Sequence, residues 1–194
     1  MPTRKLKTLV FVVCLGPAIL LFVDSFSGGL SVNPIEDITH RTGNWALRFL
    51  LITLTITPLR WMSGWNEVVR FRRMLGLFAF FYGTLHFLTY LVFDHFFNFA
   101  SIFDDVAERN WITAGFVGFV LMLPLAVTST QGWIRRLGRR WSLLHRLAYV
   151  SAIAAIVHFL WLVKIDISEP LFYGAILAVL FGVRLARRYG WRHA

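Results

Sequence analysis

Cysteine is nearly absent from this sequence: Cys14 is the only one among 194 residues. One thiol excludes a disulfide within the chain, a C-x-x-C redox pair, and a zinc or iron–sulfur site built from several cysteines. Cys14 lies inside the first apolar run, where we interpret it as a small apolar residue. Any redox centre would therefore have to be held by other side chains.

Charged residues are also scarce. They make up 15% of the chain, against about 25% in soluble domains, while 57% of the residues are hydrophobic. This composition predicts a membrane protein, with residues 1–194 forming one domain. The net charge of +10 would suggest nucleic-acid binding in a soluble protein. Here the basic residues flank apolar runs, so we expect membrane lipid as a partner and no nucleic acid.

Nucleotide-binding motifs are missing as well, since the chain has neither a G-x-G-x-x-G motif nor a Walker loop. We therefore expect no nicotinamide-binding or flavin-reductase domain within it. The sequence also shows no evident internal repeat and no low-complexity tract. The informative features are thus the apolar segments and the few polar residues inside them.

Six apolar segments dominate the chain. Each has about 17 to 21 residues, and at about 1.5 Å of rise per residue a helix of that length spans the roughly 30 Å hydrocarbon core of a bilayer. The segments are residues 6–26, 44–62, 74–93, 111–130, 143–163 and 170–186. The sequence therefore predicts an all-α integral membrane protein, a bundle of six transmembrane helices.

Charge alternates between the connections of these segments. All acidic residues except Glu67 lie in the first, third and fifth connections. Because cytoplasmic loops of membrane proteins are rich in Lys and Arg, both termini are predicted to be cytoplasmic. Most of the basic residues lie at the two termini and in the second and fourth connections: Arg4, Lys5, Lys7, Arg60, Arg70, Arg72, Arg73, Arg135, Arg136, Arg139, Arg140, Arg146, Arg184, Arg187, Arg188 and Arg192.

Two histidines lie at matching depths within the apolar segments. His86 stands eight residues before Asp94, and His158 stands eight residues before Asp166, each aspartate being the first acid of an outer connection. Both segments run from inside to outside, so the imidazoles lie at the same level. Two neutral imidazoles facing each other across a bundle are typical ligands of a six-coordinate haem iron. His40, His95 and His193 lie in loops or at ends, where we expect solvated side chains.

A third histidine, His145, lies thirteen residues before His158, about 20 Å nearer the cytoplasm along a helix. That offset suits a second site, for an inner haem, a flavin or a quinone. The third segment offers no histidine there, only Arg72, Arg73 and Met74. The two arginines either anchor the inner face or pair with haem propionates or a phosphate, whose oxygens suit a forked guanidinium.

Two other functions are consistent with these residues. His86, His145 and His158 would serve as the relay of a small proton-coupled transporter, although such carriers usually pair histidine with a carboxylate, and no acidic residue lies in mid-membrane. A stand-alone ferric reductase is the other alternative, against which the missing nucleotide domain counts. The colour and the dithionite-reduced spectrum of the purified protein separate these functions from a haem subunit.

The sequence resembles the MsrQ family, also called YedZ, the haem-binding membrane subunits of bacterial periplasmic methionine sulfoxide reductase systems. More distantly, it is similar to the transmembrane part of ferric reductases and NADPH oxidases. The resemblance covers nearly the whole chain and rests on long blocks: DITHRTGNWALRFLLITLTITPLR (37–60), RRMLGLFAFFYGTLHFLTY (72–90), LAVTSTQGWIRRLGRRWSLLHRLAYV (125–150) and HFLWLVKI followed by PLFYG (158–174).

The resemblance implies that His86, His145 and His158 are associated with one or two b-type haems in the bacterial inner membrane. Electrons would come from the quinone pool or a cytoplasmic flavin reductase, with bound FMN as a further option. They would pass to a periplasmic molybdopterin-containing catalytic subunit, MsrP-like, that reduces methionine sulfoxide in oxidised proteins. The chain would then be an electron-transfer subunit without a substrate site. The oxidases carry two histidines on the third helix, whereas this chain has arginine near the inner position.

The outer connections would form the surface that meets such a partner. They carry acidic residues that we expect to be exposed and to speed the association with the partner. This effect should be limited to low ionic strength, because salt screens such charges within about 10 Å at 0.1 M. These acids are Glu36, Asp37, Asp104, Asp105 and Glu108.

Overall fold

Long helices make up most of the computed structural model, which describes residues 2–190 and contains no strand in that range. This confirms the all-α fold class. Arg192 and His193, whose places were predicted from the sequence, lie outside the described residues. The six long helices are α1 (Pro2–Ser27), α2 (Pro34–Ser63), α3 (Val69–Thr89), α5 (Asn110–Val127), α8 (Leu147–Leu162) and α9 (Ser168–Gly190).

Five shorter elements lie in stretches that the sequence left as connections or helix ends. They are the 3-10 helix η1 (Asn66–Val68), the π-helix η2 (Tyr90–Asp94), α4 (Phe99–Glu108), α6 (Gln131–Leu137) and α7 (Arg139–Leu144). The predicted helix 143–163 is interrupted, because α7 ends at Leu144 and α8 begins only at Leu147. His145 therefore lies in a turn between two helices.

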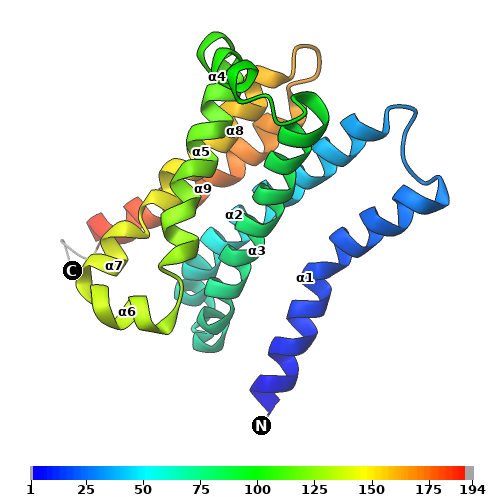
Figure 1. The fold of residues 1–194 in the computed structure, drawn as a ribbon. Coiled ribbons are helices and arrows are strands. Elements are labelled where there is room, and N and C mark those ends of the chain that lie inside the picture. The colour runs from blue at the N-terminus through cyan, green and yellow to red at the C-terminus, as the bar shows by residue number, and fades with distance from the viewer. Residues whose placement is uncertain (1, 191–194) are drawn as a thin grey trace.

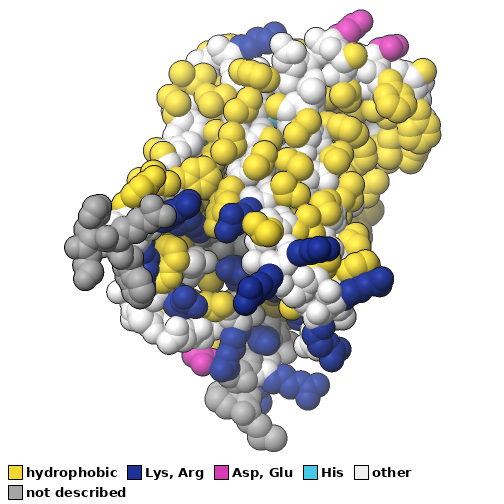
Figure 2. Space-filling view, turned by 90° about the vertical axis from the view of Figure 1, so that its left-hand side faces the viewer, with side chains coloured by type: hydrophobic (Ala, Val, Ile, Leu, Met, Phe, Trp, Pro, Cys, Tyr) yellow, Lys and Arg dark blue, Asp and Glu magenta, His cyan; other side chains and the backbone are white. Residues whose placement is uncertain are grey.

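The bundle is built from two antiparallel helix pairs, α2 with α3 and α5 with α8. Helix α9 packs against α2 and α8, while α1 lies at the edge against α2 and α3 (Figure 1). The start of α1 and helices α6 and α7 lie at one end, which we call the basic pole; α4 and the α8–α9 connection lie at the other, the acidic pole. In Figure 2, Lys and Arg side chains gather towards the basic pole, and the surface above them is largely hydrophobic.

Five stretches within residues 2–190 are helical, long and apolar enough to cross a membrane. Helix α2 differs because its apolar part contains three threonines, Arg48 and Pro58, which lower its mean hydropathy. It has 30 residues, and many of its apolar side chains are buried against protein. The six-span count therefore stays a prediction. The five stretches are Arg4–Ser27, Asn66–Asp94, Asn110–Val127, Arg139–Leu162 and Ser168–Gly190.

Side chains from other helices bond the backbone near two prolines. Pro17 lies in α1, and next to it the Tyr82 hydroxyl of α3 lies between two backbone groups, donating to the carbonyl of Cys14 (2.9 Å) and accepting from the N–H of Ala18 (3.0 Å). Pro58 has no N–H to offer the carbonyl of Leu54 four residues earlier. The Arg184 guanidinium of α9 donates to that carbonyl instead. These contacts join α1 to α3 and α9 to α2.

Candidate functional site

The two depth-matched histidines lie next to each other in the bundle. His86 is near the end of α3 and His158 is near the end of α8, and their ring centroids are 6.1 Å apart with an interplanar angle of 73°. Their helices belong to different antiparallel pairs, so the imidazoles meet where the two pairs face each other. The sequence predicted this juxtaposition from depth alone.

Each imidazole is held by a backbone carbonyl of the neighbouring helix. His86 Nδ1 lies 2.9 Å from the Thr39 carbonyl oxygen of α2, and His158 Nδ1 lies 2.6 Å from the Trp111 carbonyl oxygen of α5. A carbonyl only accepts, so each Nδ1 carries the proton and donates it. Each Nε2 then keeps its lone pair, the tautomer that metal-binding histidines use when Nδ1 bonds a carbonyl.

Glycine makes room for each ring. A Cβ added at Gly43 of α2 would lie 3.0 Å from His86 Nδ1, and one at Gly115 of α5 would lie 2.7 Å from His158 Nδ1. The second distance is shorter than real Cβ contacts, so any larger residue at 115 would displace the ring. Both imidazoles therefore lie against bare helix backbone, one turn from the carbonyl that holds them.

The carbonyl, the glycine and the histidine recur at a constant spacing of 72 residues. The corresponding pairs are Thr39 and Trp111, Gly43 and Gly115, and His86 and His158. The sequence analysis found no repeat, and for these two helix pairs that expectation is wrong. The signal that could have found it is the tripeptide HFL, at 86–88 and 158–160, followed in each case by aspartate at the same distance.

The separation of the two rings is compatible with one shared metal ion. With metal–nitrogen distances of about 2.0–2.1 Å on both sides, the centres of two coordinated imidazoles are roughly 6 Å apart. The observed separation is 6.1 Å. Two protein ligands suit an iron whose other positions are filled by a macrocycle, as in b-type haem. These residues therefore fit a haem with two axial histidines.

His145 forms a separate site nearer the basic pole. Its ring stacks on Trp141 with centroids 3.8 Å apart, and its Nδ1 lies 3.0 Å from the Trp141 carbonyl oxygen. Its Nε2 is buried and makes no hydrogen bond of normal geometry within residues 2–190, although the backbone of Leu125 in α5 lies near the ring. A buried polar atom without a partner costs about 1–3 kcal/mol, so this atom is well placed for a ligand.

The predicted arginine partners of His145 lie on α3. Arg72 is half-buried and donates to the Thr57 hydroxyl of α2 at 3.4 Å, while Arg73 is exposed. Within the described part of the chain, no hydrogen bond joins either arginine to His145. By the 72-residue spacing, Arg73 occupies on α3 the position that His145 occupies before α8.

His95 and Asp105 differ from the sequence prediction, which placed both in solvated loops. Asp105 accepts from the Tyr90 hydroxyl (3.0 Å), forms an ion pair with Arg109 Nε (2.8 Å) and lies 3.2 Å from His95 Nε2. The side chains of His95 and Asp105 are only 10% and 11% exposed. Asp105 therefore anchors α4 to its neighbours. It is not one of the exposed acids that could meet a partner, contrary to the expectation from the sequence.

The chain is similar in sequence to a known family of membrane proteins. Residues 42–157 match the model of the ferric reductase like transmembrane component. The chain is 50% identical over 192 residues to the "Protein-methionine-sulfoxide reductase heme-binding subunit MsrQ" of Xanthomonas euvesicatoria pv. vesicatoria, covering 96% of this chain and 88% of the relative.

A protein of the same name from Herminiimonas arsenicoxydans is 50% identical over 183 residues, which is 93% of this chain and 84% of that relative. No solved structure matches the chain. Since both the family model and these relatives cover most of its length, the chain belongs to the MsrQ family within the ferric reductase like transmembrane components.

Proposed function

We propose that this chain is the haem b subunit that passes electrons across the bacterial inner membrane to a periplasmic reductase of methionine sulfoxide. The observation that carries the proposal is the pair of facing imidazoles, each with Nδ1 bonded to a carbonyl and Nε2 free to ligate. The names of the relatives, which describe haem-binding subunits of a methionine sulfoxide reductase, support it.

His86 and His158 hold the iron of the outer haem through Nε2. The bound haem supplies a one-electron carrier. The carbonyls of Thr39 and Trp111 fix the tautomer and orientation of the rings and make each Nε2 a more basic ligand.

His145, Arg72 and Arg73 form the inner site, which takes a second haem, FMN or a quinone. The buried, unpartnered Nε2 of His145 supports a ligand there. The arginines pair with the propionates of a haem or with the phosphate of FMN. Electrons enter at this pole, from quinol or from a cytoplasmic flavin reductase.

The whole chain forms one domain with six membrane spans and both termini in the cytoplasm. Helix α2 is the sixth span. Thr53 and Thr55 donate to carbonyls of their own helix, and Arg48 donates to the Tyr173 hydroxyl and lies 3.7 Å from Glu169, so these polar groups have partners within the protein. The periplasmic partner is a molybdopterin-containing catalytic subunit, MsrP-like, which carries out the reduction of methionine sulfoxide.

An absorption spectrum of the purified protein tests the central claim. We expect a dithionite-reduced spectrum of low-spin haem, lost to the same extent in His86→Ala and in His158→Ala, because each change leaves the iron with one axial histidine. A colourless wild-type protein would overturn the proposal and favour a histidine relay for protons. Full haem content in either variant would show that the ligands are wrongly assigned.

A further inference from the structure

A hollow of about 390 Å³ opens at the acidic pole beside the outer histidine pair. It is formed by the start of α2 and the end of η2. It is lined by Asn33, Ile35, Glu36, Thr39, His40 and Asp94. Most of these side chains are exposed, so the hollow is accessible from the aqueous phase.

The wall of the hollow includes the residue that holds His86. The Thr39 carbonyl accepts from His86 Nδ1 at 2.9 Å, and the Thr39 hydroxyl donates to the Thr89 hydroxyl of α3 at 3.2 Å. A group bound in the hollow is therefore separated from the His86 ring by a single residue.

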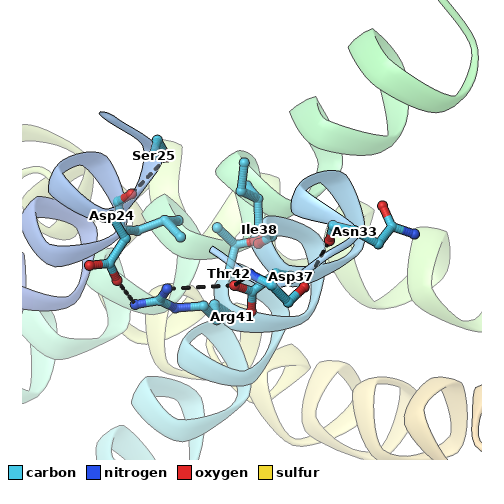
Figure 3. A network of polar contacts seen from close by, with 9 residues as sticks. Asp24, Ser25, Asn33, Asp37, Ile38, Arg41 and Thr42 are labelled. Atoms are coloured by element: carbon cyan, nitrogen blue, oxygen red, sulfur yellow. Dashed lines mark hydrogen bonds and ion pairs between the residues drawn. The ribbon is translucent and has the colours of Figure 1, made fainter. Parts of the chain in front are cut away.

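The hollow is negatively charged, because Glu36 and Asp94 line it and no Lys or Arg does. Glu36 accepts a hydrogen bond from the neutral Asn33 amide at 3.0 Å. The nearby Arg41 is already engaged: it lies 2.6 Å from Asp24 and 3.7 Å from Asp37 (Figure 3). Arg41 therefore leaves the charge of the hollow uncompensated.

The other arginines of the acidic pole are also paired elsewhere. Arg48 lies 3.7 Å from Glu169, and Arg109 lies 2.8 Å from Asp105. Within residues 2–190, neither Glu36 nor Asp94 has an ion-pair partner. The two acids are therefore free to pair with a cation of another molecule.

We propose that this hollow receives a Lys or Arg side chain of the periplasmic electron acceptor and so seats that protein over His86. The proposal rests on the proposed function, which supplies such an acceptor. Complementary charges at a docking surface raise the association rate and select the partner, and they lose this effect at high salt. On this proposal, the acids that attract the partner are Glu36 and Asp94, which lie next to the haem proposed at His86. The acids of α4 contribute little to the attraction.

The test compares two double variants with the same change in charge. The first is Glu36→Gln with Asp94→Asn, in which Gln keeps an oxygen for the Asn33 amide. The control is Asp104→Asn with Glu108→Gln, two exposed acids of α4 outside the hollow. The probe is the purified catalytic subunit of the methionine sulfoxide reductase of the same bacterium, and its affinity is measured in lipid nanodiscs at low and high salt.

We expect the hollow variant to lose about tenfold in affinity at low salt and little at high salt, since the contact is electrostatic. The control pair should bind as the wild type does. An equal loss in both pairs, or no loss in the first, would overturn the proposal. Haem spectra of all three proteins are recorded separately. A wild type without haem would contradict the proposed function. Intact haem together with unchanged binding in the hollow variant would contradict only the docking role of the hollow.

Discussion

At the scale of single residues, the histidines were predictable and their supports were not. Depth along two parallel segments placed His86 and His158 at one level, because rise per residue is constant in a helix. The carbonyls of Thr39 and Trp111 and the adjacent glycines are backbone features of other helices. Their role depends on how closely two helices approach, which apolar composition does not encode.

Gly115→Ala is the sharpest test of these supports. The new methyl group would lie 2.7 Å from His158 Nδ1, so the ring must turn away from its carbonyl and the iron must lose this ligand or bind it weakly. We expect a lower haem content and a loss of the low-spin spectrum, with a smaller effect for Gly43→Ala, where the distance is 3.0 Å.

A glycine with free space around it provides the control. Gly182 of α9 has nothing within 4 Å of an added Cβ, and Ala at an open helix position is about 1 kcal/mol more favourable than Gly. Gly182→Ala should keep the wild-type spectrum. A wild-type spectrum in Gly115→Ala as well would show that close backbone contact is not needed at the site.

At the scale of helices, the long apolar segments were predicted within about five residues at each end, except that α2 begins at Pro34, ten residues before the predicted start. The short elements were missed. Helix α4 carries three acids and lies in a connection, so average hydropathy does not reveal it. The break at His145 was also missed, because the residues LHRL around it are compatible with a helix. Only packing shows that α7 and α8 are separate and that the ring stacks on Trp141.

This break makes the inner site independent of the outer one. His145→Ala removes a ring that contacts Trp141 and none of the residues that hold His86 or His158. We expect the spectrum of the outer haem to persist. The outer haem should be reduced by the physiological donor at least about tenfold more slowly, because the inner site no longer positions a redox group between donor and haem. Stopped-flow reduction with quinol measures this. Loss of all haem in the variant would instead place the only haem at His145.

Helix α4 is anchored by Asp105, which gives a second prediction at this scale. Asp105→Ala leaves Tyr90, His95 and Arg109 without their shared acceptor. We expect a loss of about 1–3 kcal/mol in the free energy of unfolding, together with faster proteolysis between α3 and α5. The neighbouring Asp104 is exposed and has no ion pair within residues 2–190, so Asp104→Ala should change stability by less than about 0.5 kcal/mol. Equal effects of the two substitutions would contradict the role of Asp105.

At the scale of the whole molecule, the structure adds to the charge asymmetry seen in the sequence. At the acidic pole, Arg41, Arg48 and Arg109 each lie within ion-pair distance of an acid. At the basic pole, within residues 2–190, only Arg70 has such a partner, Glu67 at 2.6 Å. Exposed cations there without an acid partner in that range, such as Arg73, Arg135 and Arg188, are free to interact with anionic lipid headgroups, which attract basic segments on the cytoplasmic side.

Cysteine labelling tests the orientation that this asymmetry predicts. Cys14 is buried at 4% exposure, so Cys14→Ala gives a background without thiols at little structural cost. Ser63 at the end of α2 and Ser168 at the start of α9 are both exposed, at opposite poles. In spheroplasts, a membrane-impermeant maleimide should label Ser168→Cys at once and Ser63→Cys only after lysis, because Lys- and Arg-rich connections stay in the cytoplasm. Immediate labelling of Ser63→Cys would reverse the orientation, and it would place the hollow and the outer haem on the side from which electrons enter.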